Sequence, residues 1–268
     1  AFLIVLELTL IGASWGFLFA GIFTLQVIWA LGVSMIVMAG LVRLPPIVSL
    51  ILGGAMVCLH NLLDPITTQS LRDDGLAWLA PLWSILHEQQ FFSLRPGAPS
   101  PFTPPAVFIV YPLIPWIGVM ALGYGLAPIM RLEPPRRARA CLLLGGTACL
   151  AFLILRAANL YGDPRPFDVS PPGQPILALL NTTKYPPSLQ FLLMTIGPAL
   201  LAIPLLERLR GPVAAFLLTF GRVPLFFYIL HIPLLHLASA ALWYALFGVI
   251  SGWQIDSETF PDGYTPRL

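Results

Sequence analysis

The chain has 268 residues, of which 57% are apolar and only 10% are charged, and its mean hydropathy is +0.85. Soluble domains carry about 25% charged residues, so this chain has too little polar surface to cover a water-soluble globule. The composition therefore predicts an integral membrane protein, and a net charge of +2 does not indicate a nucleic-acid partner.

Apolar stretches of about 20 residues, the length that crosses a bilayer, divide the chain into about seven predicted crossings. They cover roughly residues 1–18, 24–42, 45–63, 106–130, 140–159, 187–206 and part of 212–250. We therefore predict an all-α, polytopic helical bundle that forms one transmembrane domain over 1–250. Residues 251–268 are expected to be an outer loop or tail.

Short basic connections between these crossings alternate with long connections in which acidic residues dominate. The basic connections contain Arg43, then Arg131, Arg136, Arg137 and Arg139, then Arg208 and Arg210. Because cytoplasmic loops are enriched in arginine and lysine, this parity predicts cytoplasmic basic loops. The acidic loops, such as 64–104 and the region around Asp163 and Asp168, are then expected outside.

The long outer loop 64–104 contains one segment with helical spacing of apolar residues. Trp78, Leu82, Ile85 and Leu86 predict a short amphipathic helix lying at the membrane interface. The proline-rich stretch "SLRPGAPSPFTPP" cannot continue this helix and is expected to be an extended linker.

Polar side chains in or beside membrane helices are costly, so they are the first candidates for function. At the outer end of the third crossing, His60, Asn61 and Asp64 lie at helical spacings of three and four residues. They could bind substrate or transfer protons at an outer cavity, or they could simply form the hydrogen bonds that the helix end needs.

In the fourth crossing, Tyr111 and Trp116 flank prolines that predict a kink. The kink could be structural, or it could expose backbone to a cavity.

Lys184 is the only lysine in the chain and lies in "NTTKYPPS", immediately before the sixth crossing. A snorkelling membrane anchor would explain the ammonium group alone. An amine held in place by Tyr185 and two prolines could instead orient an acceptor or stabilise a developing oxyanion.

The last apolar region, 212–250, is too long for one crossing and is predicted to break at Gly221–Arg222. Tyr228 and His231 share a helix face beyond the break, and Arg222 could pair with phosphate groups or snorkel. At 1.5 Å per residue from a cytoplasmic Val223, His231 lies about 12 Å deep and His236 about 20 Å deep. For either histidine, a hydrogen-bonded core role is the structural alternative.

Soluble-enzyme motifs are missing from the sequence, including the P-loop, the dinucleotide glycine fingerprint and G-x-S-x-G. The four histidines lack metal-ligand spacing, so no metal is predicted. The three cysteines lie inside apolar runs and are expected to be buried small side chains.

Several segments together resemble one family, the bacterial membrane proteins of the heparan-α-glucosaminide N-acetyltransferase-like type. The resemblance is carried in order by "LQVIWALGVSMIV", "HNLLD", "YPLIPWIGVMALGYGLAP", "NTTKYPPSLQFLLMTIGPALLA" and "FGRVPLFFYILHIPLLH". It covers nearly all of 1–248, and its most specific parts are the Lys–Tyr–Pro–Pro and Pro–Leu–Ile–Pro–Trp stretches.

The resemblance implies a transmembrane acyltransferase of about ten or eleven helices in the bacterial inner membrane. Such an enzyme moves an acetyl group from cytoplasmic acetyl-CoA to an amine or hydroxyl of a sugar or glycolipid outside. The family's N-terminal Asp–His motif, which is thought to carry the catalytic histidine, would precede Ala1, so we expect a chain truncated at both ends. His231 and Lys184 are then expected in supporting catalytic roles and Arg222 in cofactor binding.

The candidate residues for binding the acceptor are His60, Asn61, Asp64, Tyr111, Trp116, Tyr185 and Tyr228. Two other functions stay open at this point, a transporter or flippase for a small polar solute or lipid-linked sugar, and a non-catalytic membrane scaffold. Homo-oligomerisation also stays open.

Overall fold

The structure, a computed structural model, describes residues 1–16, 21–168 and 175–248, and the expected tail 251–268 lies outside these ranges. The described chain is mostly helical. Its helices are α1 (Phe2–Leu6), α2 (Gly12–Gly16), α3 (Val27–Leu41), α4 (Pro46–Leu59), α5 (Thr68–Asp73), α6 (Ala80–Leu86), α7 (Leu113–Met130), α8 (Pro134–Ala158), α9 (Pro175–Leu180), α10 (Leu189–Leu206), α11 (Pro212–Arg222) and α12 (Pro224–Phe247). A π-helical turn, Glu7–Ile11, joins α1 to α2, and 3-10 turns cover His60–Leu63 and Ala77–Leu79.

Within the described residues, five helical segments are long and apolar enough to cross a membrane: Pro46–Leu63, Leu113–Met130, Pro134–Ala158, Leu189–Leu206 and Pro224–Leu246. The helical membrane character expected from the sequence is therefore supported, but not the full set of seven crossings. The π turn interrupts the first expected crossing, and α3 has only 15 residues. Neither segment is a continuous helix of membrane length.

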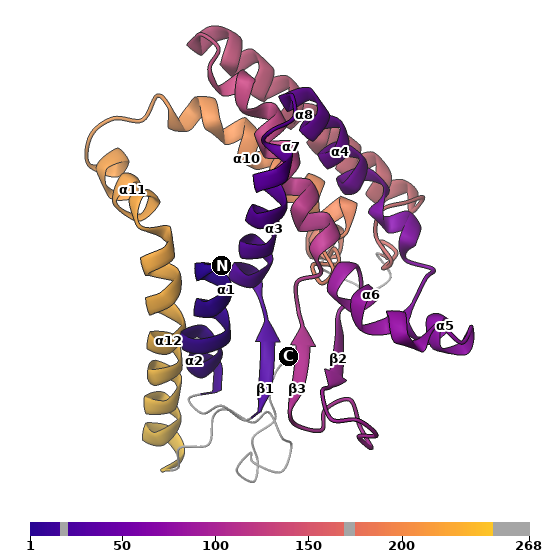
Figure 1. Cartoon of the computed structure of the whole chain (residues 1–268). Coiled ribbons are helices and arrows are strands. Elements are labelled where there is room, and N and C mark those ends of the chain that lie inside the picture. The colour runs from indigo at the N-terminus through magenta and orange to yellow at the C-terminus, as the bar shows by residue number, and fades with distance from the viewer. Residues whose placement is uncertain (17–20, 169–174, 249–268) are drawn as a thin grey trace.

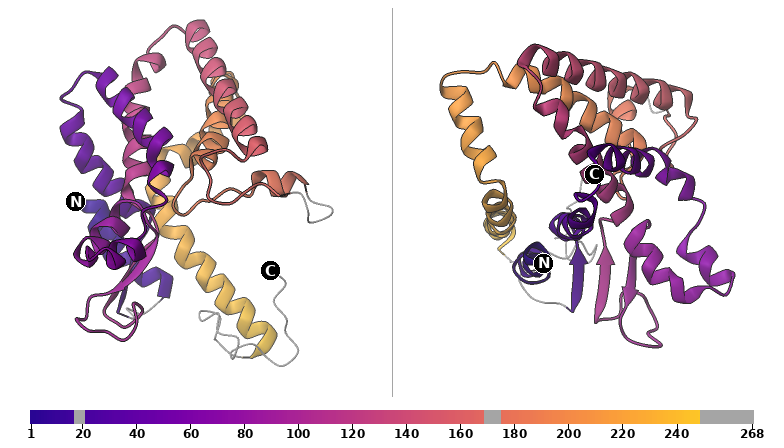
Figure 2. Two further views of the ribbon diagram at one scale, coloured as in Figure 1. Left: turned by 90° about the vertical axis from the view of Figure 1, so that its right-hand side faces the viewer. Right: turned by 45° about the horizontal axis from the view of Figure 1, so that its top comes forward.

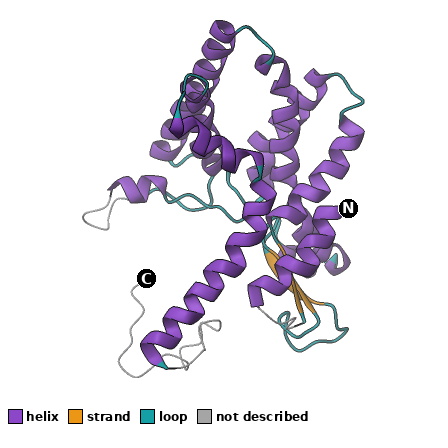
Figure 3. Cartoon of the chain, turned by 90° about the vertical axis from the view of Figure 1, so that its left-hand side faces the viewer, coloured by secondary structure: helices purple, strands orange, loops and turns teal. Residues whose placement is uncertain are grey.

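The all-α prediction misses a small sheet of the strands β1 (Ile22–Leu25), β2 (Gln90–Ser93) and β3 (Ala106–Ile109), ordered β1-β3-β2. Strand β3 runs parallel to β1 and antiparallel to β2. Figure 3 shows the strands at one end of the helices. The expected helix over 106–112 is therefore wrong, because Pro112 favours an extended conformation in the residue before it and α7 starts only at Leu113.

The long helices pack in two close pairs, α4 with α7 and α8 with α10 (Figure 2). Glycines form both contacts. A Cβ on Gly53 of α4 would lie 2.7 Å from the Gly118 carbonyl oxygen of α7, and one on Gly145 of α8 would lie 2.8 Å from the Gly197 carbonyl oxygen of α10. Small residues let membrane helices approach closely where lipid-facing apolar surface gives no driving force.

The basic connections lie together at the end of the bundle opposite the sheet (Figure 1). The Arg137 guanidinium of α8 pairs with the Glu207 carboxylate after α10, with 2.8 Å between Nε and Oε1. This ion pair joins two of the basic connections that the sequence predicts on the same side of the membrane. Their cytoplasmic orientation stays a prediction.

The expected amphipathic segment in the loop 64–104 is helical, as a 3-10 turn followed by α6. Trp78 is 75% exposed, and the Trp83 indole donates a hydrogen bond to the Ile66 carbonyl oxygen at 2.8 Å. The proline-rich linker after β2 is not helical, as predicted. A position at the membrane interface stays a prediction for this helix.

The α4–α7 contact predicts that alanine is destabilising at Gly53 but not at the neighbouring Gly54. Gly53→Ala places its Cβ against the backbone of Leu122 and Gly118, so we expect overpacking to lower the free energy of unfolding by about 1–3 kcal/mol. Gly54→Ala is the matched control, because its Cβ meets only Leu122 Cδ1 at 4.0 Å. Unfolding of both variants in detergent tests this, and equal stabilities would contradict the close contact.

Candidate functional site

The segment 182–188, which contains the lone lysine, is held by the carboxylate of Asp163. Asp163 Oδ2 accepts hydrogen bonds from the Thr183 amide and the Ser188 hydroxyl, both at 2.7 Å. Oδ1 accepts from the Thr183 hydroxyl and the Arg165 amide, both at 2.8 Å. Four donors to one carboxylate are a strong constraint, because hydrogen bonds to charged groups are about twice as strong as neutral ones.

Arg156, at the end of α8, fixes the same region from the other side and is only 2% exposed. Its guanidinium donates to the carbonyl oxygens of Leu179, Ala178, Asn181 and Arg165 at 2.8–3.2 Å. A buried cation is tolerated here because carbonyl acceptors replace its water. Arg156 therefore attaches the connection between α8 and α10 to the end of α8, and Asp163 holds that connection together from within.

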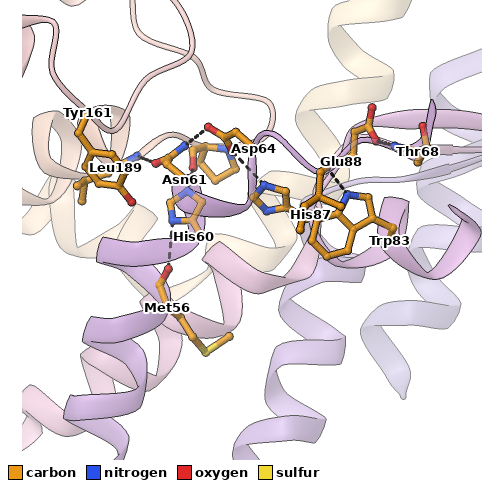
Figure 4. A network of polar contacts seen from close by, with 12 residues as sticks. Met56, His60, Asn61, Asp64, Thr68, Trp83, His87, Glu88, Tyr161 and Leu189 are labelled. Carbon is orange, nitrogen blue, oxygen red and sulfur yellow. Dashed lines mark hydrogen bonds and ion pairs between the residues drawn. The ribbon is translucent and has the colours of Figure 1, made fainter. Parts of the chain in front are cut away.

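The residues His60 and Asn61 attach this loop to α4 (Figure 4). The buried His60 ring places Nε2 2.9 Å from the Pro187 carbonyl oxygen, and its Nδ1 lies 3.0 Å from the Val57 carbonyl oxygen. Asn61 Oδ1 accepts the Leu189 amide at 2.9 Å. These contacts favour the structural alternative for both residues, because their polar atoms are used to position the start of α10.

Asp64 points the other way, toward the loop that the sequence placed outside. It accepts Asn61 Nδ2 at 2.9 Å, and its Oδ1 lies 3.0 Å from Nε2 of the buried His87. The His60 and His87 rings are edge to face with centroids 6.1 Å apart (Figure 4). His87 was not among the predicted site residues, although it follows directly after the predicted amphipathic helix.

Tyr185 and Tyr111 meet at the start of α7. Their hydroxyl oxygens are 3.3 Å apart, and the Lys184 ammonium lies 5.0 Å from the centroid of the Tyr185 ring. Burial would raise the pKa of Tyr185, but the hydrogen bond with Tyr111 and the ammonium of Lys184 outweigh it and lower this pKa. Burial raises the pKa of Tyr111. Of the two phenols, Tyr185 is therefore the one that releases its proton more readily.

A pocket of about 280 Å³ opens beside these two phenols. It is lined by Gln26, Val27, Tyr111, Tyr185, Tyr228, His231, Ile232, Leu235 and His236. We call it the tyrosine pocket. The sheet helps to build it, because the Tyr111 amide donates to the Leu25 carbonyl oxygen at 3.3 Å and so places Gln26 beside Tyr111.

The two histidines of the tyrosine pocket both use Nδ1 for a backbone contact. His231 Nδ1 lies 3.0 Å from the Phe227 carbonyl oxygen, and His236 Nδ1 lies 2.7 Å from the Ser14 carbonyl oxygen. A carbonyl only accepts, so Nδ1 carries the hydrogen in each ring. In neutral His231 the Nε2 lone pair is then an acceptor, which is the tautomer that a base at Nε2 requires.

Glu7, in the π turn before α2, is a buried carboxylate that sequence analysis did not select. It is 0% exposed, and its Oε2 accepts the Ile28 and Trp29 amides of the first turn of α3, each at 3.2 Å. Its Oε1 has no hydrogen-bond partner among the described residues. An acidic residue inside an apolar segment was the available sequence signal, and the same rule would have selected Arg156.

Trp116 and Arg222 lie in different surroundings. Trp116 packs on Tyr111 with ring centroids 5.3 Å apart. It does not line the tyrosine pocket but supports one of the residues that do. Arg222 instead lines an open groove of about 560 Å³ between the end of α10 and α11, together with Arg210 and apolar residues. The expected cofactor residue is therefore not in the tyrosine pocket.

The sequence placed Tyr228 and His231 toward the basic side and Tyr111 and Tyr185 at the opposite end, and this separation is wrong. All four line one pocket. The reason is that α11 leads away from the basic end of the bundle before α12 begins (Figure 1). The first turns of α12, with Tyr228 and His231, therefore line the same pocket as Tyr111.

No protein-family model, curated protein or solved structure shows a significant match to this chain. Within the described ranges, no group of three or more histidine, cysteine, aspartate or glutamate side chains could hold a metal ion. The chemistry of the site therefore has to be argued from its own residues.

The Asp163 network predicts a large effect of Asp163→Asn. The asparagine NH2 group would stand where Oδ2 accepts hydrogen bonds from the Thr183 amide and the Ser188 hydroxyl, and an NH2 group cannot accept them. We therefore expect a loss of about 2–3 kcal/mol in stability and faster hydrogen exchange at the Thr183 amide. Asp73→Asn is the control, because exposed Asp73 accepts only Gln69 Nε2 at 2.8 Å. Similar melting temperatures for the two variants would show that the network does not hold the loop.

The pKa of Tyr185 predicts a role for the lone lysine that can be measured. Lys184→Gln removes the ammonium group that favours the phenolate, so the pKa of Tyr185 should rise. Ultraviolet difference titration, with Tyr185→Phe to identify the phenol concerned, measures this change. Arg95→Gln, which removes a distant cation, should leave the titration unchanged, and an unchanged titration in Lys184→Gln would contradict the coupling.

Proposed function

We propose that the chain belongs to a transmembrane acyltransferase that transfers an acetyl group from acetyl-CoA to an amine or hydroxyl group of a sugar or glycolipid at the outer face of the bacterial inner membrane. The observation that carries the proposal is the tyrosine pocket, in which an imidazole with an acceptor Nε2 and three tyrosine side chains line the same cavity. The segments that line it are also those that carry the family resemblance. Acyl transfer needs a base for the acceptor and donors for the charge on the acyl oxygen.

Each residue of the pocket has a distinct part in this proposal. His231 Nε2 takes the proton from the acceptor amine or hydroxyl as that atom attacks the acyl carbon, and later returns it to the leaving sulfur. The Tyr228 hydroxyl donates to the acyl oxygen, where negative charge develops. Acetyl-CoA, when bound, supplies the acetyl group as a thioester. Lys184 and Tyr185, at the rim, orient the acceptor.

The donor would bind toward the basic end of the bundle. The groove with Arg210 and Arg222 combines guanidinium groups, which suit phosphates, with an apolar lining of Leu206, Leu217 and Leu218. From Val223 at the end of this groove to His231, the helix α12 rises about 12 Å. An extended thioester arm held by Arg222 would therefore run along the first two turns of α12.

The proposal predicts a selective effect of His231→Gln in the full-length protein in proteoliposomes. Loss of the base should lower the rate of acetyl transfer by about 10²-fold or more, with folding intact. Leu230→Ala is the matched control, since Leu230 is the neighbouring residue, is exposed and does not line the pocket. Unchanged transfer in His231→Gln, or no binding of acetyl-CoA by the full-length protein, would refute the proposal.

A transporter or flippase is the second candidate, and the break between α11 and α12 favours it. Val223 has φ −130° and ψ 44°, and interrupted helices beside a pocket are typical of transport sites. Accumulation of a sugar in sealed vesicles without any acyl donor would establish transport. Transfer that strictly requires acetyl-CoA would exclude it as the main activity.

A further inference from the structure

Another hollow in the molecule lies at the basic end, between the first turn of α8 and the connection from α10 to α11. It has a volume of about 540 Å³ and is lined by Pro134, Pro135, Arg137, Ala138, Pro204, Glu207, Arg208 and Arg210. We call it the arginine groove. It shares Arg210 with the groove assigned above to the acyl donor, but no residue with the tyrosine pocket.

The charges of the arginine groove do not cancel. Glu207 is paired with Arg137 at 2.8 Å, which leaves Arg208 and Arg210 without a carboxylate partner among the described residues. Arg210 is held in place because its Nη1 donates to the carbonyl oxygens of Glu207 and Leu209, both at 2.8 Å. The Arg208 side chain forms no hydrogen bond within the described chain. An anion would therefore find one fixed and one adaptable guanidinium.

The position of the groove fits a ligand that has an apolar body. Both α8 and α10 are long and apolar enough to cross a membrane, and the groove lies where one begins and the other ends. Leu142, one turn beyond Ala138 on α8, is 49% exposed, and Leu205 of α10 is 66% exposed. Apolar surface therefore continues from the groove toward the hydrocarbon region.

We propose that the arginine groove binds the head-group phosphate of an anionic phospholipid, with its acyl chains along the exposed leucines of α8 and α10. The shared chemistry is a phosphate anion on Arg208 and Arg210, and the apolar path beside it selects a lipid over a free phosphate compound. Basic pockets between membrane helices recognise anionic head groups in this way. The proposal does not depend on the proposed enzymatic function.

The test uses the full-length protein in nanodiscs that contain palmitoyl-oleoyl phosphatidylglycerol or the zwitterionic phosphatidylcholine. After extraction into detergent, native mass spectrometry counts the lipid molecules that stay bound. We expect phosphatidylglycerol to be retained by the wild type and its retention to fall about fivefold in Arg208→Gln, the loss expected for one cation near a membrane surface. Arg208→Lys, which keeps the charge, should restore most of the retention.

The control is Arg136→Gln, because Arg136 is exposed at the same end of α8 but does not line the groove. Equal losses in Arg136→Gln and Arg208→Gln would mean a diffuse electrostatic attraction and would overturn the proposal. Equal retention of phosphatidylcholine would do the same. Displacement of the lipid by CoA or by inorganic phosphate would identify the groove as a site for a soluble phosphate compound instead. Should Arg208→Gln fail to fold, the lipid comparison and the displacement arms on the wild type still decide the question.

Discussion

The carboxylate of Asp163 is the constraint on which most of the described site depends. It accepts three hydrogen bonds from Thr183 and Ser188, besides one from the nearby Arg165 amide, and so determines the path of the segment 182–188. That path brings the Pro187 carbonyl to His60 of α4 and the Tyr185 hydroxyl to Tyr111 before α7. Three membrane-length helices are thereby connected at one end through a loop. The apolar helix faces could not specify this register alone, because they are nearly equivalent in lipid.

The tyrosine pocket depends in turn on two departures from regular membrane helices. The strand β3 stops the expected fourth crossing short and places Tyr111 at the bundle end rather than inside it. The π turn at Glu7–Ile11 brings a buried carboxylate to the first amides of α3. Such turns occur mostly as single-turn insertions within α-helices, and they are frequent at functional sites. In the strand β3 and in the π turn alike, hydrogen bonds to backbone groups fix the positions of side chains that hydrophobic packing alone would not fix.

Charge divides the molecule into two ends with different chemistry. Guanidinium groups without a carboxylate partner among the described residues lie where α8 begins and α10 ends, and the phenols and imidazoles of the tyrosine pocket lie at the other end. The helices between them are almost purely apolar. Phosphate groups would therefore be attracted to one end, and proton transfer could take place at the other.

The sequence by itself determined the helical character, the apolar segments of membrane length and the grouping of the basic connections. These follow from composition, span length and charge parity, which are local properties of the chain. Only the tertiary structure decided that His60 and Asn61 are used as hydrogen-bonding supports, while Tyr111, Tyr185, Tyr228 and His231 share a pocket. It also showed the roles of Glu7, Arg156 and Asp163. The reason is that these contacts join residues about 20 to 130 positions apart in the sequence. The local sequence around one polar side chain does not indicate which distant carbonyl or amide group it will contact.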